Sequence, residues 1–299
     1  MKVVIGASSF AAADQTALNF LLDHGCEVIK NPRGRKLTEE ETIAFIQGAD
    51  GLLAGLEPLN RKVLSAAGRG LKAIARIGTG LDNVDLAAAE ALGIKVSNTP
   101  DGPTAGVAEM TVAALLALSR RLVSADRNMH SRAWVKEMGR SLSGLTVLII
   151  GFGRIGRAVA ERLEVFGSDI LVYDPIGAPD LSAGTLEDLL PRADVISLHA
   201  GGEALILGPR EFQLLRPGAV LLNSARAGLV DEQALLGALR SGRLAGCWLD
   251  VFSPEPYDGP LCDCENALLT PHLSTYTDQC RRQMEWQAVN NLLRDLNVI

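Results

Sequence analysis

Apolar and polar positions along the chain follow two patterns, short apolar runs and longer stretches with helical spacing. Within residues 1–100 the two patterns alternate. The apolar runs predict strands at 2–5, 27–29, 50–54, 71–76 and 94–97. The stretches between them predict helices at 12–22, 38–46, 61–67 and 86–92. Strand–helix alternation of this kind indicates a parallel sheet with helices on its faces.

The alternation stops at a run of turn-forming residues, Asn98-Thr99-Pro100-Asp101-Gly102-Pro103, where we place the crossing between two domains. A strongly apolar helix is predicted at 107–118, and a second helix extends to about residue 136. The apolar helix lies outside the regular alternation and therefore needs a partner. Either the other subunit of a dimer or the interdomain core would bury it.

Beyond these helices the alternation resumes. Strands are predicted at 146–150, 170–173, 194–199, 219–223, 245–249 and 267–269. Helices are predicted at 185–190, 209–215, 231–239 and 277–296, and another carries Val159, Leu163 and Phe166. The pattern predicts an α/β protein with two Rossmann-like or flavodoxin-like parallel-sheet domains and a cleft between them. The first domain comprises 1–99 plus 275–299, because the last helix is expected to return to it, and the second comprises 100–274.

The segment after strand 146–150 reads Gly151-Phe152-Gly153-Arg154-Ile155-Gly156, the G-x-G-x-x-G pattern of dinucleotide-binding loops. Gly151 permits the tight turn, Gly153 lets a pyrophosphate approach the backbone, and Gly156 lets helix and strand pack closely. The N–H groups at the helix start then face the phosphates. The hexapeptide alone is a weak signal, but between a strand and a helix it is a strong one.

Asp174 ends the next predicted strand, 18 residues after Gly156. An acidic side chain at this place accepts hydrogen bonds from the adenosine ribose hydroxyls. It would also repel a 2′-phosphate, and neither Pro175 nor Ile176 supplies a compensating cation. The sequence therefore favours NAD over NADP as the cofactor.

Composition and charge narrow the function classes. The 299-residue chain is 47% hydrophobic and 21% charged, as globular proteins are, and its net charge of −6 gives no electrostatic case for nucleic acid. The beginning, MKVVIG, is a strand signal and not a secretory one, and no apolar stretch is long enough to span a bilayer. An odd number of cysteines, 5, argues for free thiols. Without a secretory signal or a spanning stretch, we expect a cytoplasmic protein. No two histidines have metal-ligand spacing, so we expect no metal site.

Three residues with complementary chemistry follow predicted strands of the second domain: Arg226, Glu255 and His272. The planar fork of an arginine matches a carboxylate and polarises a carbonyl. A histidine transfers protons near neutrality, and an adjacent carboxylate orients its ring. The set suits reduction of a 2-oxo acid, with the first-domain loop Gly78-Thr79-Gly80 expected to face it across the cleft. On spacing alone, an ordinary surface role for these residues is equally consistent with the sequence.

The chain resembles the D-2-hydroxyacid dehydrogenases, and in particular their phosphoglycerate-dehydrogenase-like branch, over nearly its whole length. The motifs that carry the resemblance occur in a fixed order at specific intervals. They are Arg76-Ile77-Gly78-Thr79-Gly80-Leu81-Asp82-Asn83-Val84-Asp85, Val107-Ala108-Glu109, the glycine hexapeptide, Asn223-Ser224-Ala225-Arg226, Leu229-Val230-Asp231-Glu232, Leu249-Asp250-Val251-Phe252 with Glu255-Pro256, and Thr270-Pro271-His272.

The resemblance implies roles for individual residues. It implies that Arg226 anchors the substrate, that Glu255 is the partner acid and that His272 is the general acid/base. The cofactor-contacting set that we expect consists of Gly151, Gly153, Arg154, Ile155, Gly156, Asp174, His199, Ser224, Ala225 and Asp250, with Asp250 on the nicotinamide amide. The substrate-contacting set consists of Arg76, Gly78, Thr79, Gly80 and Arg226. The family is usually dimeric through the helix that carries Val107-Ala108-Glu109.

The sequence departs from the family's pattern at two places. The loop after His199 reads Ala200-Gly201-Gly202-Glu203-Ala204, where the family usually has Thr-Pro-Leu and a few more residues. This departure lies beside the expected adenosine and bears on cofactor affinity. Ala227 stands where a glycine usually follows the arginine, which is tolerable only if the backbone there does not need a positive φ.

The leading hypothesis is an NAD-dependent oxidoreductase that transfers a hydride between nicotinamide and a small D-2-hydroxy acid or 2-oxo acid. The substrate would be 3-phosphoglycerate-like, glyoxylate/hydroxypyruvate-like or phosphonopyruvate-like. A substrate with an oxoanion at each end would need additional cationic side chains to bind it. Arg33, Arg35 and Arg76 lie in or near first-domain loops. The alternatives are an NAD-sensing protein of the corepressor type and a phosphite-type dehydrogenase, which would keep the same three residues.

Overall fold

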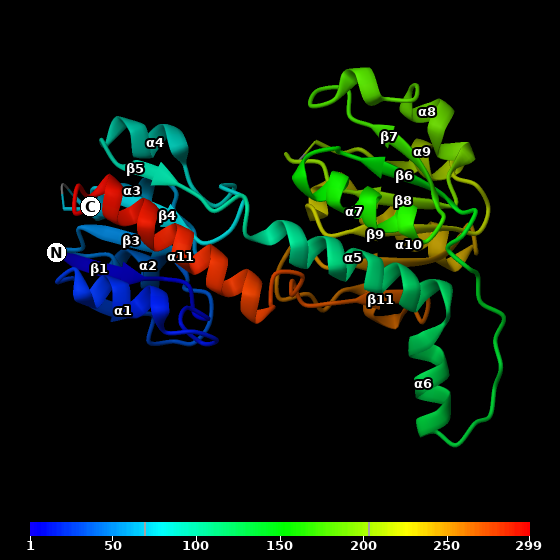
Figure 1. Cartoon of the computed structure of the whole chain (residues 1–299), viewed down its shortest axis with the longest axis horizontal. Helices are drawn as coiled ribbons and strands as arrows, with labels where there is room; N and C mark the ends of the chain where they lie inside the picture. Colours follow the sequence, from blue (N-terminus) through cyan, green and yellow to red (C-terminus); the bar gives the residue numbers. More distant parts are fainter. Residues whose placement is uncertain (69, 203) are drawn as a thin grey trace. The chain divides into compact units, whose positions relative to one another are not determined.

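The computed structural model describes residues 1–68, 70–202 and 204–299, and the predicted alternation forms two sheets in it. The chain divides into two compact units, one of Met1–Pro103 with Thr275–Ile299 and the other of Thr104–Ser274. The prediction of two parallel α/β sheets is confirmed (Figure 1).

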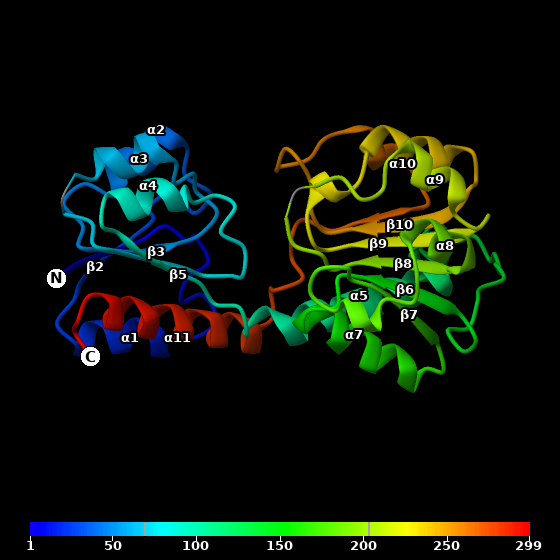
Figure 2. The same cartoon turned by 90° about the horizontal axis from the view of Figure 1, so that it is seen from above.

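The sheet of the first unit is parallel throughout, in the order β2-β1-β3-β4-β5. Its strands are β1 (Lys2–Ile5), β2 (Glu27–Lys30), β3 (Gly51–Ala54), β4 (Ala73–Arg76) and β5 (Lys95–Ser97). One face carries α1 (Thr16–Asp23) and α11 (Asp278–Asp295), and the other carries α2 (Glu39–Phe45), α3 (Arg61–Ala66) and α4 (Leu86–Ala91) (Figure 2). Because side chains alternate along a strand, Val3 and Ile5 pack under α1 and α11, whereas Val4 packs under α2 and α3. The C-terminal helix thus completes the first core.

The sheet of the second unit is also parallel, in the order β11-β10-β9-β8-β6-β7. Its strands are β6 (Thr146–Ile150), β7 (Asp169–Tyr173), β8 (Val195–Leu198), β9 (Ala219–Asn223), β10 (Leu244–Leu249) and β11 (Ala267–Leu269). α5 (Pro103–Ser119) and α7 (Arg154–Val165) cover one face, and α8 (Leu186–Leu189), α9 (Pro209–Leu214) and α10 (Glu232–Arg240) cover the other. Short 3-10 helices stand at Pro179–Leu181, Leu190–Arg192, Ala227–Leu229 and Pro260–Asp263.

Each strand order contains one point at which the chain reverses the direction in which strands are added. In the first unit this point lies between β1 and β3, and in the second it lies between β6 and β8. At this point the connections from the two neighbouring strands leave in opposite directions. A crevice therefore remains outside the carboxyl ends of the strands, which is the usual place for ligands in open α/β sheets. The two crevices therefore locate the places where chemistry is expected.

The helix pair after the crossing differs from the prediction. α5 begins at Pro103, earlier than predicted, and buries Ala108, Val112 and Leu115 in the core of the second unit. α6 (Leu122–His130) ends before residue 136 and has no buried residue. Arg132, with φ +63°, interrupts the helical backbone shortly after its end. Figure 1 shows α6 and the segment after it leading away from the sheet.

The first helix of the chain also begins later than predicted, at Thr16. Ala11 adopts φ +60°, a left-handed conformation that does not continue as a helix. Its backbone N–H donates to Oε2 of Glu285 on α11 at 3.0 Å, and Glu285 is 2% exposed. The loop after β1 is thus shaped by a buried carboxyl group far away in the sequence. No helix in the described ranges combines the length and the apolarity needed to cross a bilayer.

Candidate functional site

The glycine hexapeptide connects β6 to α7 at the crevice of the second sheet. Gly151 has φ +89°, and a Cβ there would lie 2.4 Å from the backbone nitrogen of Ala200, beyond the end of β8. A Cβ on Gly156 would lie 2.1 Å from the carbonyl oxygen of Gly151. These two glycines are therefore required by the protein's own packing.

Gly153 differs from both, because a Cβ there would meet nothing within 4 Å. The space beside it is open, and it adjoins Arg154 and Ile155 in the first turn of α7. The first N–H groups of a helix have no intrahelical acceptor, and they carry the positive end of the dipole. The loop therefore fits a pyrophosphate, with Gly153 leaving room for its approach.

Asp174 follows β7 and faces the same loop. Its Oδ2 accepts the Phe152 N–H at 2.8 Å, and its Oδ1 accepts the Gly177 N–H at 2.7 Å. Burial opposes ionisation of the carboxyl group, but the hydrogen bonds from Phe152, Gly177 and nearby backbone N–H groups outweigh it and lower the pKa of Asp174. The group is thus a fixed acceptor at the edge of the crevice, where a ribose hydroxyl suits it.

His199 and Ser224 follow the neighbouring strands β8 and β9. Nε2 of His199 lies 2.8 Å from the Ser197 hydroxyl, and burial lowers the pKa of His199 to about 4. His199 is therefore neutral near neutrality and is no competitor for acid–base work. The buried Oγ of Ser224 has no hydrogen-bond partner in the described part of the chain, which leaves it available to a ligand. The effect expected of the loop after His199 rests in part on residue 203, which lies outside the described residues.

Arg226 is held at the carboxyl end of β9 by a buried amide. Asn223 is 1% exposed; its Nδ2 donates to the Arg226 carbonyl at 2.9 Å, and its Oδ1 accepts the Ala225 N–H at 3.0 Å. The guanidinium of Arg226 donates to the Ala225 carbonyl at 2.7 Å. Ala227 does not adopt a positive φ, so its Cβ is tolerated where the family usually has glycine.

Glu255 and His272 come together from the ends of β10 and β11. Nδ1 of His272 lies 3.1 Å from both carboxylate oxygens of Glu255, and Oε1 of Glu255 also accepts the Phe252 N–H at 3.1 Å. A carboxylate only accepts, so Nδ1 carries the hydrogen and Nε2 is left to face a reactant. His272 has φ +51°, a left-handed conformation that is uncommon for non-glycine residues.

Asp250 fixes the segment that bears His272. The carboxylate is 1% exposed and accepts four hydrogen bonds from three residues. These come from the Thr270 hydroxyl at 2.6 Å, the Leu273 N–H at 2.9 Å, and the Ser274 N–H and hydroxyl at 2.9 and 2.5 Å. Asp250 therefore braces both sides of His272, a role that the sequence motif did not indicate, because the bonds close over 20 to 24 residues.

The substrate residues expected in the first unit lie at the end of β4. Gly78 donates its N–H to the Thr99 hydroxyl at 2.7 Å, and the guanidinium of Arg76 lies over Gly78 and donates to the Ile77 carbonyl. The N–H groups of Thr79 and Gly80 donate to no acceptor among residues 1–68, 70–202 and 204–299. Arg76 thus braces the loop, and the two free donors suit a carboxylate.

The carboxyl edge of the second sheet is a continuous line of these groups. Reading along the strand order, it runs from His272 through Glu255, Arg226 and His199 to the glycine loop and Asp174. Neighbouring strands lie about 4.8 Å apart, so the line spans about 24 Å across five steps. No set of three His, Cys, Asp or Glu residues suited to a metal occurs in the ranges that the structure describes.

The fold and this line of groups define a class of protein, the dinucleotide-binding α/β proteins with an acid–base pair at the far end of the crevice. Residues 112–274 match the profile of the D-isomer specific 2-hydroxyacid dehydrogenase family, NAD binding domain. The chain belongs to this family, and the cofactor that the match indicates is NAD.

Three relatives illustrate the similarity. D-3-phosphoglycerate dehydrogenase of Homo sapiens is 38% identical over 293 residues, which cover 94% of this chain and 54% of that protein. The crystal structure of TT0316 protein from Thermus thermophilus superposes with a TM-score of 0.89 at 36% identity, covering 99% and 97% of the two chains. A glyoxylate reductase from Paecilomyes thermophila has a TM-score of 0.87 at 27% identity, covering 99% and 95%. The chain spans about half the length of the curated relatives it matches.

Proposed function

We propose that this chain is an NAD-dependent dehydrogenase that interconverts a small D-2-hydroxy acid and the corresponding 2-oxo acid. The observation that carries the proposal is the His272–Glu255 pair, with both carboxylate oxygens 3.1 Å from Nδ1. The pair lies at the ends of β11 and β10, the next two strands in the sheet after β9, which leads to Arg226. Bound NADH would supply the hydride. Arg226 would hold the substrate carboxylate and polarise its carbonyl, since a guanidinium offers paired donors.

His272 completes the proposed chemistry. In reduction, its protonated Nε2 gives a proton to the developing alkoxide, and the Glu255 carboxylate has stabilised the imidazolium until then. In oxidation, the neutral ring takes the hydroxyl proton. The free N–H groups of Thr79 and Gly80 support a second hold on the substrate carboxylate. Four protein groups already donate hydrogen bonds to the Asp250 carboxylate. Any contact between Asp250 and the nicotinamide amide would therefore lie at the edge of this hydrogen-bond network.

The substrate class that we propose is a short 2-oxo acid that is 3-phosphoglycerate-like, glyoxylate/hydroxypyruvate-like or phosphonopyruvate-like. The names of the human and Paecilomyes relatives support the first two. The test is a panel of 2-oxo acids with purified protein, followed by NADH absorbance, with NADPH at equal concentration. If NADH binds but no member of the panel is reduced, the protein is a dinucleotide-binding protein and the enzyme proposal fails.

Replacing Asp174 by asparagine is expected to raise the NADH dissociation constant about tenfold or more, because a hydrogen bond to a charged group contributes about 1.5 to 3 kcal/mol. The affinity for NADPH should change less, since the repulsion of a 2′-phosphate is removed at the same time. Quenching of protein fluorescence on titration with each cofactor measures both constants. Asp180→Asn, on the exposed segment just beyond, is the matched control. Equal losses for the two cofactors would contradict the role of Asp174 in cofactor choice.

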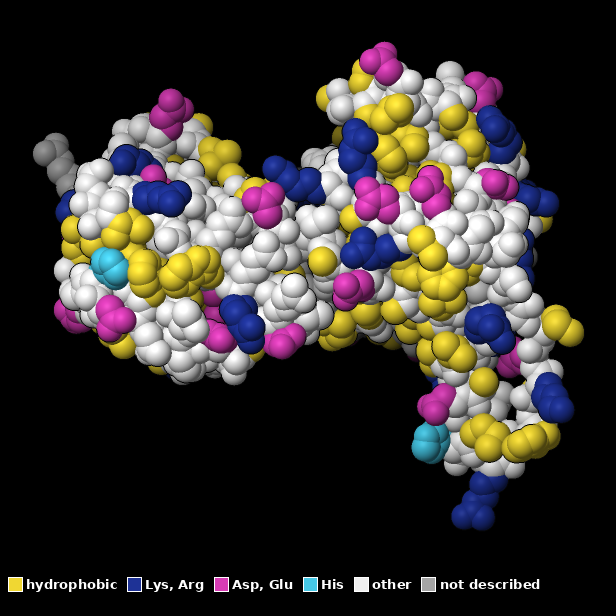
Figure 3. Space-filling model, in the orientation of Figure 1, with side chains coloured by type: hydrophobic (Ala, Val, Ile, Leu, Met, Phe, Trp, Pro, Cys, Tyr) yellow, Lys and Arg dark blue, Asp and Glu magenta, His cyan; other side chains and the backbone are white. Residues whose placement is uncertain are grey.

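We also propose that the protein is a homodimer, with α6 and the segment after it covered by the second copy. Trp134 is 78% exposed and Met138 is 92% exposed, which is unusual for large apolar side chains. Figure 3 shows hydrophobic side chains on the surface of this projecting part. A cavity of about 300 Å³ at its base is lined by Leu118, Val123 and Met138. Association through this surface would bury them.

Changing both Trp134 and Met138 to glutamate is expected to convert the dimer into a monomer, because two charges would have to be buried in the interface. Size-exclusion chromatography with light scattering measures the mass of each variant. Val165→Glu replaces an 87% exposed apolar residue at the end of α7 and should leave the dimer intact. A wild-type protein of 31.7 kDa in solution would contradict the proposal.

A further inference from the structure

The crevice of the first sheet is shaped by two glycines and a buried carboxyl group. Gly6 follows β1 and Gly55 follows β3, the two strands that flank the reversal point. Glu57, 1% exposed, fills the place between them: a Cβ on Gly6 would lie 1.9 Å from its Oε1. The Gly55 N–H donates to both carboxylate oxygens, at 3.1 and 3.0 Å. The floor of this crevice is therefore fixed.

The loop from β2 to α2 is tied to the end of β1, beside this crevice. Asn31 forms the tie, since its Nδ2 donates to the Gly6 carbonyl and to the Arg35 carbonyl, both at 2.8 Å. Its Oδ1 accepts the Arg33 N–H at 2.9 Å. At the other end, Leu37 is 3% exposed and anchors the loop in the protein. These contacts give the loop a defined conformation at the carboxyl edge of the sheet. The loop presents three cationic side chains around Gly34.

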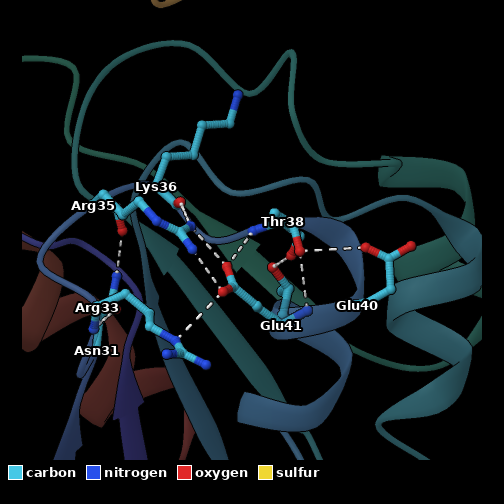
Figure 4. Close-up of polar contacts among 8 residues, drawn as sticks. Asn31, Arg33, Arg35, Lys36, Thr38, Glu40 and Glu41 are labelled. Atoms are coloured by element: carbon cyan, nitrogen blue, oxygen red, sulfur yellow. Dashed lines mark hydrogen bonds and ion pairs between the residues drawn. The ribbon is translucent and has the colours of Figure 1, made fainter.

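Glu41 neutralises only part of this positive charge. Both oxygens pair with the fork of Arg35, at 2.8 and 2.7 Å, and Oε1 also lies 3.4 Å from Nε of Arg33 (Figure 4). The hydrogen bonds from Arg35, helped by the Thr38 backbone, lower the pKa of Glu41 to about 2, so it is ionised near neutrality. Arg33 and Arg35, two of the three arginines considered for a second oxoanion, therefore pair with Glu41.

Of the three cationic side chains in this loop, Lys36 is the one that Glu41 does not neutralise. Its side chain extends away from Glu41 and both arginines in Figure 4, and its ammonium group makes no ion pair with any residue in 1–68, 70–202 or 204–299. Burial raises the pKa of Glu57, and the charges of Arg76 and Lys36 are among the effects that oppose this rise. The Lys36 charge therefore acts on the Glu57 carboxyl group at the floor of the crevice.

We propose that Lys36 is a specificity-determining residue that binds a second anionic group, a phosphate, phosphonate or carboxylate, at the far end of the substrate. The inference rests on the proposed function, in which Thr79 and Gly80 at the same edge of the sheet hold the first carboxylate. The Arg35–Glu41 pair and Asn31 position the loop, and Lys36 makes the contact. An ammonium group carries a compact positive charge and three hydrogen-bond donors, so it binds a phosphate, a phosphonate or a carboxylate.

The test compares 2-oxo acids that differ only in the second anion. Pyruvate is compared with oxaloacetate and phosphonopyruvate, and hydroxypyruvate with its 3-phosphate ester, each reduced with NADH by the purified protein. The wild type should show a higher kcat/KM for at least one dianion than for its monoanionic partner. Lys36→Met should lower that ratio about tenfold, or about 1.4 kcal/mol, mainly through KM, as expected for loss of a uniform binding contact. The pair with the largest loss identifies the anion.

Two further variants separate charge from structure. Lys36→Arg keeps the cation and should restore most of the ratio. Lys72→Met removes a lysine at the opposite edge of the same sheet, where it lies 3.0 Å from Asp50, and should leave the ratio at its wild-type value. Added salt should reduce the ratio in the wild type but not in Lys36→Met, because it screens an exposed charge. NADH titration of each variant reports on folding.

A ratio in Lys36→Met equal to that of the wild type would overturn the inference, and so would a wild type that prefers every monoanion. These results leave the dehydrogenase proposal intact. If no member of the panel is reduced, the dehydrogenase proposal itself is wrong and the inference falls with it. The two failures are therefore distinguishable.

Discussion

Replacing His272 by alanine is expected to lower kcat for the reduction of a 2-oxo acid by about 10²- to 10⁴-fold, the usual contribution of a positioned general acid. The affinity for NADH should stay close to that of the wild type, because His272 lies at the end of β11 and the glycine loop lies four strands away. Stopped-flow reduction at saturating NADH measures the first effect, and fluorescence titration measures the second.

Two variants make this result specific. Glu255→Gln keeps a hydrogen-bond partner for Nδ1 but removes the charge that stabilises the imidazolium, so it should have a smaller effect than His272→Ala. His130→Ala changes a histidine whose side chain is 82% exposed on α6 and should leave kcat unaltered. If His272→Ala abolished NADH binding or folding, His272 would be a structural residue.

Replacing Arg226 by alanine is expected to lower kcat/KM by about 100- to 1,000-fold, in line with the ~3 to 4 kcal/mol that one removed electrostatic donor costs in an active site. Arg226→Lys should recover only part of the loss, because an ammonium lacks the planar fork that matches a carboxylate. Both KM and kcat should worsen, since the guanidinium binds the substrate and also polarises its carbonyl.

The matched control is Arg210→Ala on α9, whose side chain is 75% exposed and which should behave as the wild type. Asn223→Ala offers an indirect route to the same effect, because Asn223 holds the Arg226 backbone without facing the substrate. An Arg226→Ala variant with unchanged KM for every 2-oxo acid would contradict the anchoring role of the guanidinium.

The strands and the glycine loop were predictable because their signals are local. An apolar run such as Thr146–Ile150 reads as a buried strand in any context, and G-x-G-x-x-G specifies its own turn. The capping box that opens the helix after Thr38 is confirmed for the same reason, since Thr38 and Glu41 satisfy each other's backbone N–H groups within one turn.

The predicted start of the first helix and the predicted end of the helix after Arg121 were both wrong. The first helix begins four residues late, since Glu285 holds Ala11 in a left-handed conformation from 274 positions away. The helix after Arg121 ends at His130, although no glycine or proline follows it closely. A pattern that reads only neighbouring residues cannot detect the contact between Ala11 and Glu285, whereas the end at His130 coincides with the left-handed backbone of Arg132 close by.

The site shows the same division between local and distant signals. The candidate residues His272, Glu255 and Arg226 were chosen by residue type at predicted strand ends, which the order of elements along the chain reveals. The brace around Asp250 and the pairing of Arg35 with Glu41 depend on side chains that meet only after folding. Arg33 and Arg35 were considered for a second oxoanion, yet Lys36 is the one that faces away from Glu41. Charge alone could not separate neutralised cations from the remaining one.

The bond between Asp174 and the Phe152 N–H bears on attempts to re-engineer cofactor choice. The usual strategy for accepting NADP replaces the acidic residue after the second strand with a small or basic one. Here the same carboxylate closes the glycine turn, at 2.8 Å from that N–H, and also the turn at Gly177, at 2.7 Å. Such a redesign would have to provide another acceptor for both turns, or the gain in NADP binding would be offset by a looser phosphate loop.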